Sequence, residues 1–169
     1  QILERWVIRN ADEVWYATKR MYDVHVSRQG RRLTRIPERI VPCPFDAYPE
    51  THFLWKPQHL HRFVYVGVVG RGGGLDVVLP TIARLRSRWP DIRLDVVGTG
   101  PDGDVFKEET QRLELQDFVT FHGFVEREEH VRRLVGQAAA GVSLYDPALA
   151  QHSRYTQASR VYRYIGCGT

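Results

Sequence analysis

A glycine-rich segment that follows a short hydrophobic run is the first part of the sequence suited to binding a ligand. Residues 67–74 contain five glycines in eight positions. Closely spaced glycines allow several backbone N–H groups to converge on one anion, and a helix beginning next to them would add about half a positive charge. The composition predicts either a phosphate-binding loop or a flexible turn. The candidate phosphate-binding residues are Gly67, Arg71, Gly72 and Gly73.

The spacing of these glycines excludes two common nucleotide-binding motifs. It fits neither Gly-x-x-x-x-Gly-Lys-Ser/Thr nor Gly-x-Gly-x-x-Gly. Asp95 lies inside the next predicted strand instead of at its end, where an acid would bind a dinucleotide ribose. We therefore do not expect a dinucleotide-dependent dehydrogenase.

A second polar segment, 145–160, combines hydroxyl groups, two arginines (Arg154 and Arg160) and the start of a helix. These groups suit a diphosphate. Ser159 is expected to cap the helix while the free N–H groups of its first turn face the ligand. An ordinary polar loop that ends in a capped helix has the same composition, so both interpretations stay open.

The histidines do not form a convincing metal site. His52, His59 and His61 lie in a proline-rich segment without a nearby cysteine or paired carboxylates, so the sequence predicts neither a metal nor another cofactor. His122 and Gly123 follow a hydrophobic run and should lie at the carboxyl end of a strand. A catalytic role for His122 is compatible with that place, but we favour a polar strand end.

The elements that would position these residues alternate regularly between strand and helix. Short hydrophobic runs predict strands at 63–66, 92–97, 118–121 and 140–144, and amphipathic patterns predict helices at 75–89, 105–115, 127–137 and from about 159. Pro80 indicates that the first of these helices either starts there or is kinked. The alternation predicts an α/β fold with a parallel, Rossmann-like sheet flanked by helices, and ligand sites beyond the carboxyl ends of its strands.

The part of the chain before residue 62 has a different organisation. Helical patterns and strand-like runs occur there at 3–9, 13–17, 18–28 and 39–42, and residues 43–61 have no periodicity. We therefore divide the chain into residues 1–46, a linker at 47–61 and a main domain at 62–169. The pattern stops where another strand would be expected, so we expect a chain truncated at both ends.

Composition restricts the class of protein further. The chain is 43% hydrophobic and 26% charged, and its net charge of +4 comes mainly from arginines spread along the sequence, which argues against a nucleic-acid partner. No apolar stretch approaches the ~20 residues of a membrane span, and no signal peptide is recognisable. With the two isolated cysteines Cys43 and Cys167, these features predict a cytoplasmic protein, and the positive charge is compatible with peripheral contact to a membrane.

Six segments, taken in chain order, resemble motifs of the retaining GT-B glycosyltransferases of the group 1, or family 4, type. They are 9–14 for R-x-A-D-x-V, 40–46 for V-I-P-N-G-V-D, 63–67 with 74–76 for Y-V-G-R-L…K-G-L-D, 94–101 for L-x-I-V-G-x-G-P, 119–125 for V-x-F-x-G-x-V, and 158–169 for P-S-K-L-x-E-Y-L-A-x-G-x. Each motif is weak by itself, but their order and gaps together are specific. The resemblance implies that 62–169 is the carboxy-terminal half of a GT-B fold, and that 1–46 is the end of its amino-terminal domain and the hinge.

The resemblance also implies an activity, the transfer of a hexose from a nucleotide diphosphate sugar to an alcohol acceptor, such as a glycan or a lipid-linked sugar in polysaccharide assembly. The acceptor would lie in an amino-terminal domain, so the fragment alone should be inactive. By this resemblance the expected diphosphate-binding residues are Gly67, Arg71, Gly72, Gly73, Ser159 and Arg160. The expected nucleoside-binding residues are Gly98, Gly100, His122, Gly123, Phe124, Val125 and Arg163, and Tyr155 and Thr156 would contact the donor sugar.

Four positions depart from the family pattern. Val68 and Gly73 replace an arginine and a lysine of the first loop, and Tyr155 and Arg163 replace the two acids of a Glu-x7-Glu motif. Arg160 can stand in for the lysine beside the last helix, whereas Arg163 cannot accept hydrogen bonds from ribose hydroxyls. These departures leave two alternatives open: a non-catalytic binding or scaffolding module of the same fold, and a sugar-nucleotide epimerase whose catalytic acids and histidine we cannot place.

Overall fold

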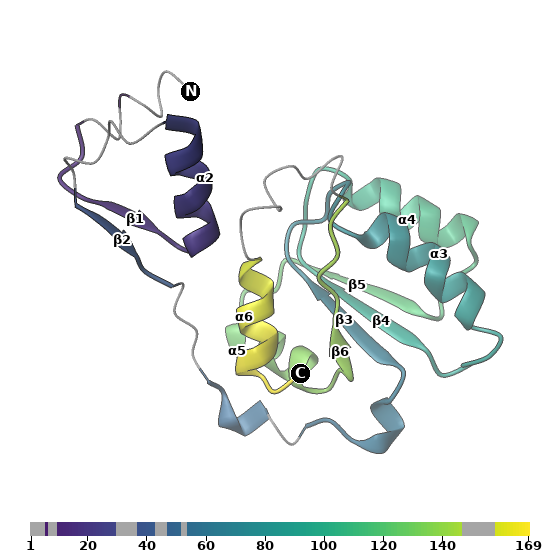
Figure 1. Ribbon diagram of the computed structural model, residues 1–169. Coiled ribbons are helices and arrows are strands. Elements are labelled where there is room, and N and C mark those ends of the chain that lie inside the picture. The colour runs from purple at the N-terminus through teal and green to yellow at the C-terminus, as the bar shows by residue number, and fades with distance from the viewer. Residues whose placement is uncertain (1–5, 7–9, 30–36, 43–46, 52–53, 147–157) are drawn as a thin grey trace. The chain divides into compact units, whose positions relative to one another are not determined.

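The computed structural model of the chain describes residues 6, 10–29, 37–42, 47–51, 54–146 and 158–169. The chain divides into two compact units, one of Gln1–Pro44 with His152–Gln157 and one of Phe45–Gln151 with Ala158–Thr169. The second unit contains every described residue of the candidate sites. Figure 1 shows the elements of both units.

A four-stranded parallel sheet forms the centre of the second unit (Figure 1). Its strands are β3 (Arg62–Val66), β4 (Arg93–Val97), β5 (Val119–Gly123) and β6 (Ala140–Gly141), in the spatial order β5-β4-β3-β6. The chain therefore builds the sheet outward from β3 through β4 to β5 and then returns to the other side of β3. This reversal makes a topological switch point at the carboxyl ends of β3 and β6, the place where open α/β sheets bind ligands. The α/β class expected from the sequence is confirmed.

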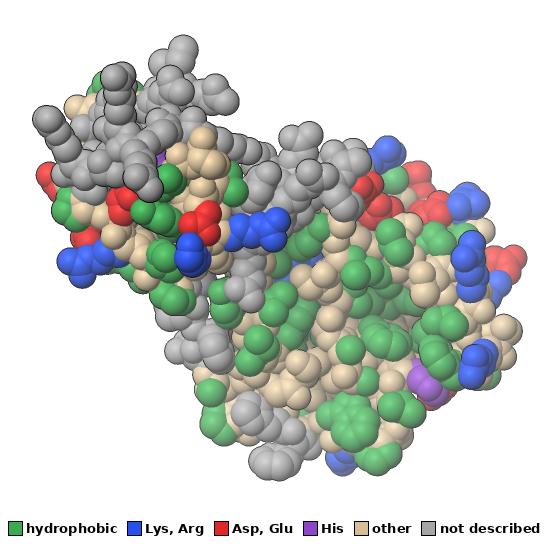
Figure 2. All heavy atoms as spheres, viewed as in Figure 1, with side chains coloured by type: hydrophobic (Ala, Val, Ile, Leu, Met, Phe, Trp, Pro, Cys, Tyr) green, Lys and Arg blue, Asp and Glu red, His purple; other side chains and the backbone are tan. Residues whose placement is uncertain are grey.

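Helices cover both faces of this sheet. One face carries α3 (Leu75–Leu85) and α4 (Gly103–Arg112), and the other carries α5 (Glu128–Gly136) and α6 (Ser159–Gly166) (Figure 1). Figure 2 shows basic and acidic side chains interspersed over α3 and α4, so the outer surface of these two helices is of mixed sign.

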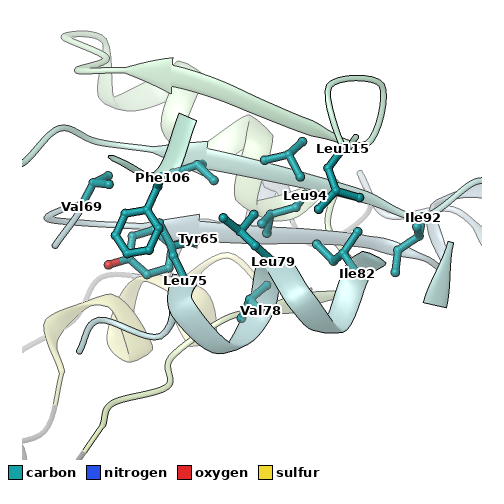
Figure 3. Packing of buried hydrophobic residues seen from close by; sticks show 12 residues of the cluster. Tyr65, Val69, Leu75, Val78, Leu79, Ile82, Ile92, Leu94, Phe106 and Leu115 are labelled. Carbon is teal, nitrogen blue, oxygen red and sulfur yellow. The ribbon is translucent and has the colours of Figure 1, made fainter. Parts of the chain in front are cut away.

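The period of each element explains its packing. Four side chains of α3, Leu75, Val78, Leu79 and Ile82, recur at helical spacing and are buried against the strands (Figure 3). Along the strands the period is two: Tyr65 of β3 packs toward α3 and α4, whereas Val64 and Val66 pack toward α5 and α6. Burial of each such aliphatic side chain contributes about 1.5–3 kcal/mol. This core fixes the strand ends on which the candidate site is built.

Several element boundaries differ from the sequence-based prediction. Helix α3 begins at Leu75 and contains Pro80 in its interior, so the helix does not start at the proline. It ends at Leu85 instead of residue 89: residues 86–88 form a turn, and Pro90 disfavours a helical conformation for Trp89. Strand β6 has two residues instead of the expected five, although the next amide, Val142 N, still donates to the Val64 carbonyl oxygen at 2.7 Å.

The described part of the region predicted as a linker contains two short helices. Residues Pro49–Thr51 and Pro57–His59 form short 3-10 helices. Thr51 is buried, and its hydroxyl lies 2.7 Å from the Tyr48 carbonyl oxygen and 3.2 Å from the Cys167 carbonyl oxygen. Residues 48–51 therefore pack against the end of α6 as part of the second unit, while the role of 47–61 as a linker stays a prediction.

The first unit contains a small βαβ arrangement. Strand β1 (Val14–Tyr16) and strand β2 (Glu38–Ile40) are parallel and are connected through α2 (Lys19–Gln29). Tyr16 is buried and packs edge-on against Tyr22, with ring centroids 5.4 Å apart. The strands predicted at 13–17 and 39–42 and the helix predicted at 18–28 are confirmed within two residues at each end. The helix predicted at 3–9 lies almost wholly outside the described residues.

Among the described residues, no helix has the length and apolar character needed to cross a membrane.

Candidate functional site

The first loop, residues 67–74, leaves β3 and crosses closely over the loop that follows β4. A Cβ at Gly98 would overlap the Gly67 carbonyl oxygen, and a Cβ at Gly100 would overlap the backbone of Val69. Gly98 also has a φ of 130°, which side chains rarely adopt. We infer that these two glycines, predicted to bind the nucleoside, are needed in any case for the close approach of the two loops.

The hydroxyl of Tyr65 holds the first loop in place. Tyr65 is fully buried in β3, and its hydroxyl donates a hydrogen bond of 2.6 Å to the Val68 carbonyl oxygen. Gly73 lies against the same hydroxyl, since a Cβ at this position would be 2.8 Å from the oxygen. In the middle of the loop, the backbone N–H of Arg71 donates a hydrogen bond of 2.8 Å to Asp102 Oδ2. The loop therefore has a defined path, as a preformed anion-binding loop requires.

A cleft of about 520 Å³ opens beside this loop, at the switch point between β3 and β6. Its volume lies in the range of small-molecule sites, roughly 300–1,000 Å³. The described residues that line it come from four places: the end of β3, the first loop, the segment after β6 and the first turns of α6. They are Val66, Gly67, Val68, Gly70, Arg71, Gly72, Gly73, Tyr145, Ser159, Arg160 and Arg163.

The structure brings together residues that the sequence placed in two separate loops. All six residues predicted to bind a diphosphate line this cleft: Gly67, Arg71, Gly72, Gly73, Ser159 and Arg160. The cleft lining contains three arginines and no acidic side chain among the described residues. Its chemistry is therefore that of a site for an anion.

Arg160 has the most distinctive environment of the three arginines. Its guanidinium carbon lies 4.3 Å from the ring centroid of Tyr65 and 5.3 Å from that of Tyr145. Its Nη1 atom is shielded from solvent and has no hydrogen-bond partner among the described residues. A buried N–H group without a partner is costly, so this atom marks a place where an acceptor is missing.

The N-terminus of α6 also faces the cleft, because Ser159 and Arg160 open the helix and line the cavity. Ser159 was expected to cap this helix, and that prediction is wrong. Ala158 occupies the N-cap position and provides no side-chain hydrogen bond, so Ser159 is the first helical residue. The amides of a first helical turn have no partner within the helix and carry partial positive charge.

Arg163 lies one turn farther along α6 and is paired differently. Its Nη2 atom is 3.3 Å from Glu128 Oε2 at the start of α5. The carboxylate balances the charge of Arg163, whereas Arg160 lies over two aromatic rings and has no carboxylate partner in the described part of the chain. The two arginines therefore make unequal contributions to the field in the cleft.

The residues predicted to bind the nucleoside are not gathered in one cavity. Gly98, Gly100, His122 and Gly123 line a second hollow of about 360 Å³ beside the ends of β4 and β5, whereas Arg163 lines the first cleft. Phe124 is 74% exposed, and Val125 packs against the hydrophobic cluster on the α5–α6 face. Tyr155 and Thr156, predicted to contact the donor sugar, lie outside the described residues.

The side chain of His122 takes part in an ion-pair network that the sequence analysis missed. Asp95 is only 5% exposed and accepts from Arg62 Nε at 2.8 Å, and its other oxygen lies 2.7 Å from His122 Nε2. A buried carboxylate requires such partners because it has lost its hydration. The unusual place of an aspartate in the middle of a hydrophobic strand was the one signal in the sequence. These contacts support the interpretation of His122 as a polar strand end.

Two tyrosines of the cleft were also missed. Tyr65 reads as an ordinary core residue of a strand, and Tyr145 as part of a polar loop. Only the sheet order places them both beside Arg160, since β6 returns next to β3.

No group of three or more His, Cys, Asp or Glu side chains that could hold a metal ion occurs in the described part of the chain. His61, one of the three histidines considered above, pairs with Asp91 at 2.8 Å and stacks on Trp89. The hydrogen bond from His61 lowers the pKa of the Asp91 carboxyl. This group lies beside the first residues of β3 and β4, at the amino-terminal ends of the strands, whereas the cleft lies at their carboxyl ends.

These features define a Rossmann-like α/β domain with a cationic cleft at its switch point. The sequence profile described as "Glycosyl transferases group 1" matches residues 54–144. The chain therefore belongs to the group 1 glycosyltransferase family, and its second unit has the fold of the carboxy-terminal domain of GT-B enzymes. No curated protein matches the sequence.

Several solved structures share the fold at low sequence identity. Anabaena Alr3699/HepE, solved in complex with UDP and glucose, is 15% identical with a TM-score of 0.72, and the match covers 99% of this chain and 46% of that one. The pneumococcal O-GlcNAc transferase GtfA, in complex with UDP and GlcNAc, is 12% identical with a TM-score of 0.61, covering 93% and 42%. TarM of S. aureus is 12% identical with a TM-score of 0.62, covering 85% and 27%. The chain thus spans less than half the length of each of these proteins.

Proposed function

We propose that the second unit holds the nucleotide diphosphate sugar donor of a hexosyltransferase, with the diphosphate in the cleft between the first loop and α6. The observation that carries the proposal is the unpartnered Nη1 of Arg160 in a cleft whose described lining has arginines and no acid. A diphosphate supplies both the acceptor oxygens and the negative charge that this arrangement lacks.

The same arrangement suits the chemical step of glycosyl transfer. When the bond between sugar and diphosphate breaks, negative charge develops on the departing diphosphate. Arg71, Arg160 and the N-terminus of α6 would stabilise that charge from the walls of the cleft. No metal is needed in this scheme, because the cations come from the chain itself.

The nucleoside would extend from the cleft toward the carboxyl ends of β4 and β5. Gly98, Gly100, His122 and Gly123 line the hollow there, and Phe124 is exposed beside it. We retain these residues as candidates for nucleoside contact, mainly through backbone groups, and Tyr155 and Thr156 as candidates for contact with the donor sugar. The acceptor, a glycan or lipid-linked sugar, would be bound by an amino-terminal domain to which β1, α2 and β2 belong. We expect the present chain by itself to bind donor without transferring sugar. A cytoplasmic location with contact to a membrane surface is part of the same proposal.

A panel of nucleotides tested by thermal shift would examine this function. UDP is the first ligand to try, since the HepE and GtfA structures contain it, with GDP, ADP and their glucose conjugates beside it. A ligand present at 100 times its dissociation constant stabilises the folded state by about 2.7 kcal/mol. For a domain of this size that corresponds to roughly 5–10 °C in Tm. Silence across the whole panel would contradict donor binding.

A non-catalytic binding module is the second candidate, and one observation favours it. Val68, at a position where the family has an arginine, is 66% exposed at the rim of the cleft. The side chain of an exposed valine provides neither a hydrogen-bond donor nor a positive charge for a phosphate. Absence of any nucleotide-induced shift would favour this alternative.

A further inference from the structure

The aromatic rings around Arg160 are the feature of the cleft that donor binding leaves unexplained. Arginine in a folded protein usually pairs with a carboxylate. Here the guanidinium lies over two tyrosine rings, at 4.3 Å from Tyr65 and 5.3 Å from Tyr145, and no salt bridge of Arg160 occurs among the described residues. Contact with a ring face attracts the cation through the ring quadrupole without neutralising its charge.

The geometry of such a contact matters for binding. The five N–H donors of a guanidinium lie in its plane, so a ring packed over the plane leaves them available. A carboxylate partner would instead occupy two of them. The tyrosines can therefore fix the orientation of Arg160 without occupying its N–H donors, and no described residue accepts a hydrogen bond from its Nη1.

Tyr65 connects this arginine to the other wall of the cleft. Its ring lies under Arg160 of α6, while its hydroxyl donates to the Val68 carbonyl oxygen in the first loop. Arg160 also lies close to the first residue of that loop, since a Cβ at Gly67 would be 3.0 Å from its Nη2. One buried side chain thus sets the spacing between the loop and the arginine.

Tyr145 is held next to the same loop from the side of β6. The following amide, Asp146 N, donates to the Gly72 carbonyl oxygen at 3.1 Å. The preceding residue, Leu144, lies close to Gly74: a Cβ on Gly74 would be 2.8 Å from the Leu144 Cβ atom. The backbone on either side of Tyr145 is therefore held against the first loop by contacts that do not involve Arg160.

We propose that Tyr65 and Tyr145 are positioning residues that hold the guanidinium of Arg160 in the orientation in which its N–H groups bind the donor diphosphate. The inference rests on the proposed function, because it assigns a role within the same site. It predicts that a tyrosine substitution weakens nucleotide binding only through Arg160.

A double-mutant cycle on nucleotide affinity tests this dependence. UDP dissociation constants would be measured by calorimetry for the parent chain, Tyr145→Leu, Arg160→Met and the double variant. Without the ring, Arg160 must be ordered when the ligand binds, which predicts roughly 2- to 10-fold weaker binding for Tyr145→Leu. In the Arg160→Met background the same substitution should have no further effect. Tyr145→Phe, which keeps the ring face, should bind UDP like the parent chain. Tyr65 is less suitable for the cycle, because its replacement by leucine would also open a cavity in the core.

A matched control is Phe118→Leu, which removes a similar ring–arginine contact. The guanidinium carbon of Arg93 lies 5.4 Å from the centroid of the Phe118 ring, near the amino-terminal ends of the strands and away from the cleft. It should leave the UDP affinity unchanged. An equal loss from Tyr145→Leu in both backgrounds would overturn the inference, since it would show direct contact with the ligand or a general structural role. No loss in either background would also overturn it. If the parent chain binds UDP but the effects of the two substitutions simply add, the positioning role alone is contradicted. If the parent chain does not bind UDP, both the proposed function and this inference are contradicted.

Discussion

Two arginines one turn apart on α6 illustrate how local environment separates a binding residue from a structural one. Arg163 has a carboxylate partner, Glu128, and its charge is balanced within the fold. Arg160 lies beside two aromatic rings, and no described residue accepts a hydrogen bond from its Nη1. Residue type alone would rank them equally, because both are arginines that line the same cleft. The contacts of each side chain favour Arg160 as the candidate for anion binding.

Glycine at the crossing of the two loops leads to a prediction about stability. We expect Gly98→Ala to destabilise the fold by roughly 2–4 kcal/mol, because the methyl group would overlap the Gly67 carbonyl oxygen and the φ of 130° disfavours alanine. Urea denaturation would measure the loss. Gly103→Ala is the matched control: nothing lies within 4 Å of its Cβ position at the start of α4, and it should stabilise by up to about 1 kcal/mol. Equal effects of both substitutions would show that the loops do not cross as described.

At the scale of elements, α6 is fixed to the sheet by one buried phenol. The Tyr164 hydroxyl accepts from Val66 N at 3.1 Å and donates to the Val142 carbonyl oxygen at 3.0 Å. It thereby joins α6 to β3 and to the segment after β6, the three parts that surround the cleft. Burial is the main cause that raises the pKa of Tyr164 from 10.0 to about 12.

This phenol gives a prediction about pH. Tyr164→Phe should cost about 1–3 kcal/mol near neutral pH, because the Val66 N–H group loses its acceptor. In the parent chain the folded state keeps the phenol neutral while the unfolded state ionises from its ordinary pKa of 10.0 upward. The contribution of Tyr164 to stability is therefore complete below pH 10 and declines as the pH rises toward 12. Denaturation of both proteins between pH 8 and 11.5 would show the stability difference shrinking above pH 10. A difference that stays constant over this range would argue against the buried phenol.

The order of the elements was predictable because each has its own hydrophobic period. The strand β3 contains a continuous buried run, Val64, Tyr65 and Val66, as expected for a strand that is covered on both faces. In the helix that follows, hydrophobic residues recur at intervals of three and four. The ends of elements were less predictable. At β6, Gly141 packs directly against the ring of Tyr164, which is more than twenty residues away in the sequence. The cap of α6 was wrong by one residue, because serine was preferred over alanine on propensity alone.

The cleft itself was predictable in its glycines and cations but not in its aromatic residues. The six residues that a phosphate-binding pattern suggested are brought together by the switch in strand order. The rings of Tyr65 and Tyr145 carry no such pattern, and their proximity to Arg160 exists only after β6 has joined β3. The same reason explains why the Arg62–Asp95–His122 network was missed, since its members come from three different strands.

At the scale of the whole molecule, the chain contains two units and spans less than half the length of the solved structures that share its fold. All the described residues proposed to bind the donor belong to the second unit. The first unit contributes β1, α2 and β2, whose place in an acceptor-binding domain is part of the proposal. Ligand effects should therefore be confined to one unit.

Hydrogen exchange measured by mass spectrometry would test that confinement. On addition of UDP, amides of the first loop and of the first turn of α6 should exchange more slowly, because the ligand satisfies and shields them. Amides of α2, and those at the end of α4 near Arg112, serve as internal references and should not change. Protection restricted to the loops around Gly98 and Gly123 would move the diphosphate site to the second hollow.

The most direct test of a diphosphate-binding cleft is a calorimetric comparison of uridine, UMP and UDP on the parent chain and on Arg160→Met and Arg163→Met. We expect affinity to increase with each phosphate and to fall with added salt, since charge-assisted hydrogen bonds dominate. Arg160→Met should weaken UDP binding by roughly 10- to 100-fold, the equivalent of a charged hydrogen bond of 1.5–3 kcal/mol. Arg163→Met should have the smaller effect, because Glu128 already balances that charge. Uridine binding as tightly as UDP, or UDP binding that is unaffected by loss of Arg160, would contradict the assignment of the cleft.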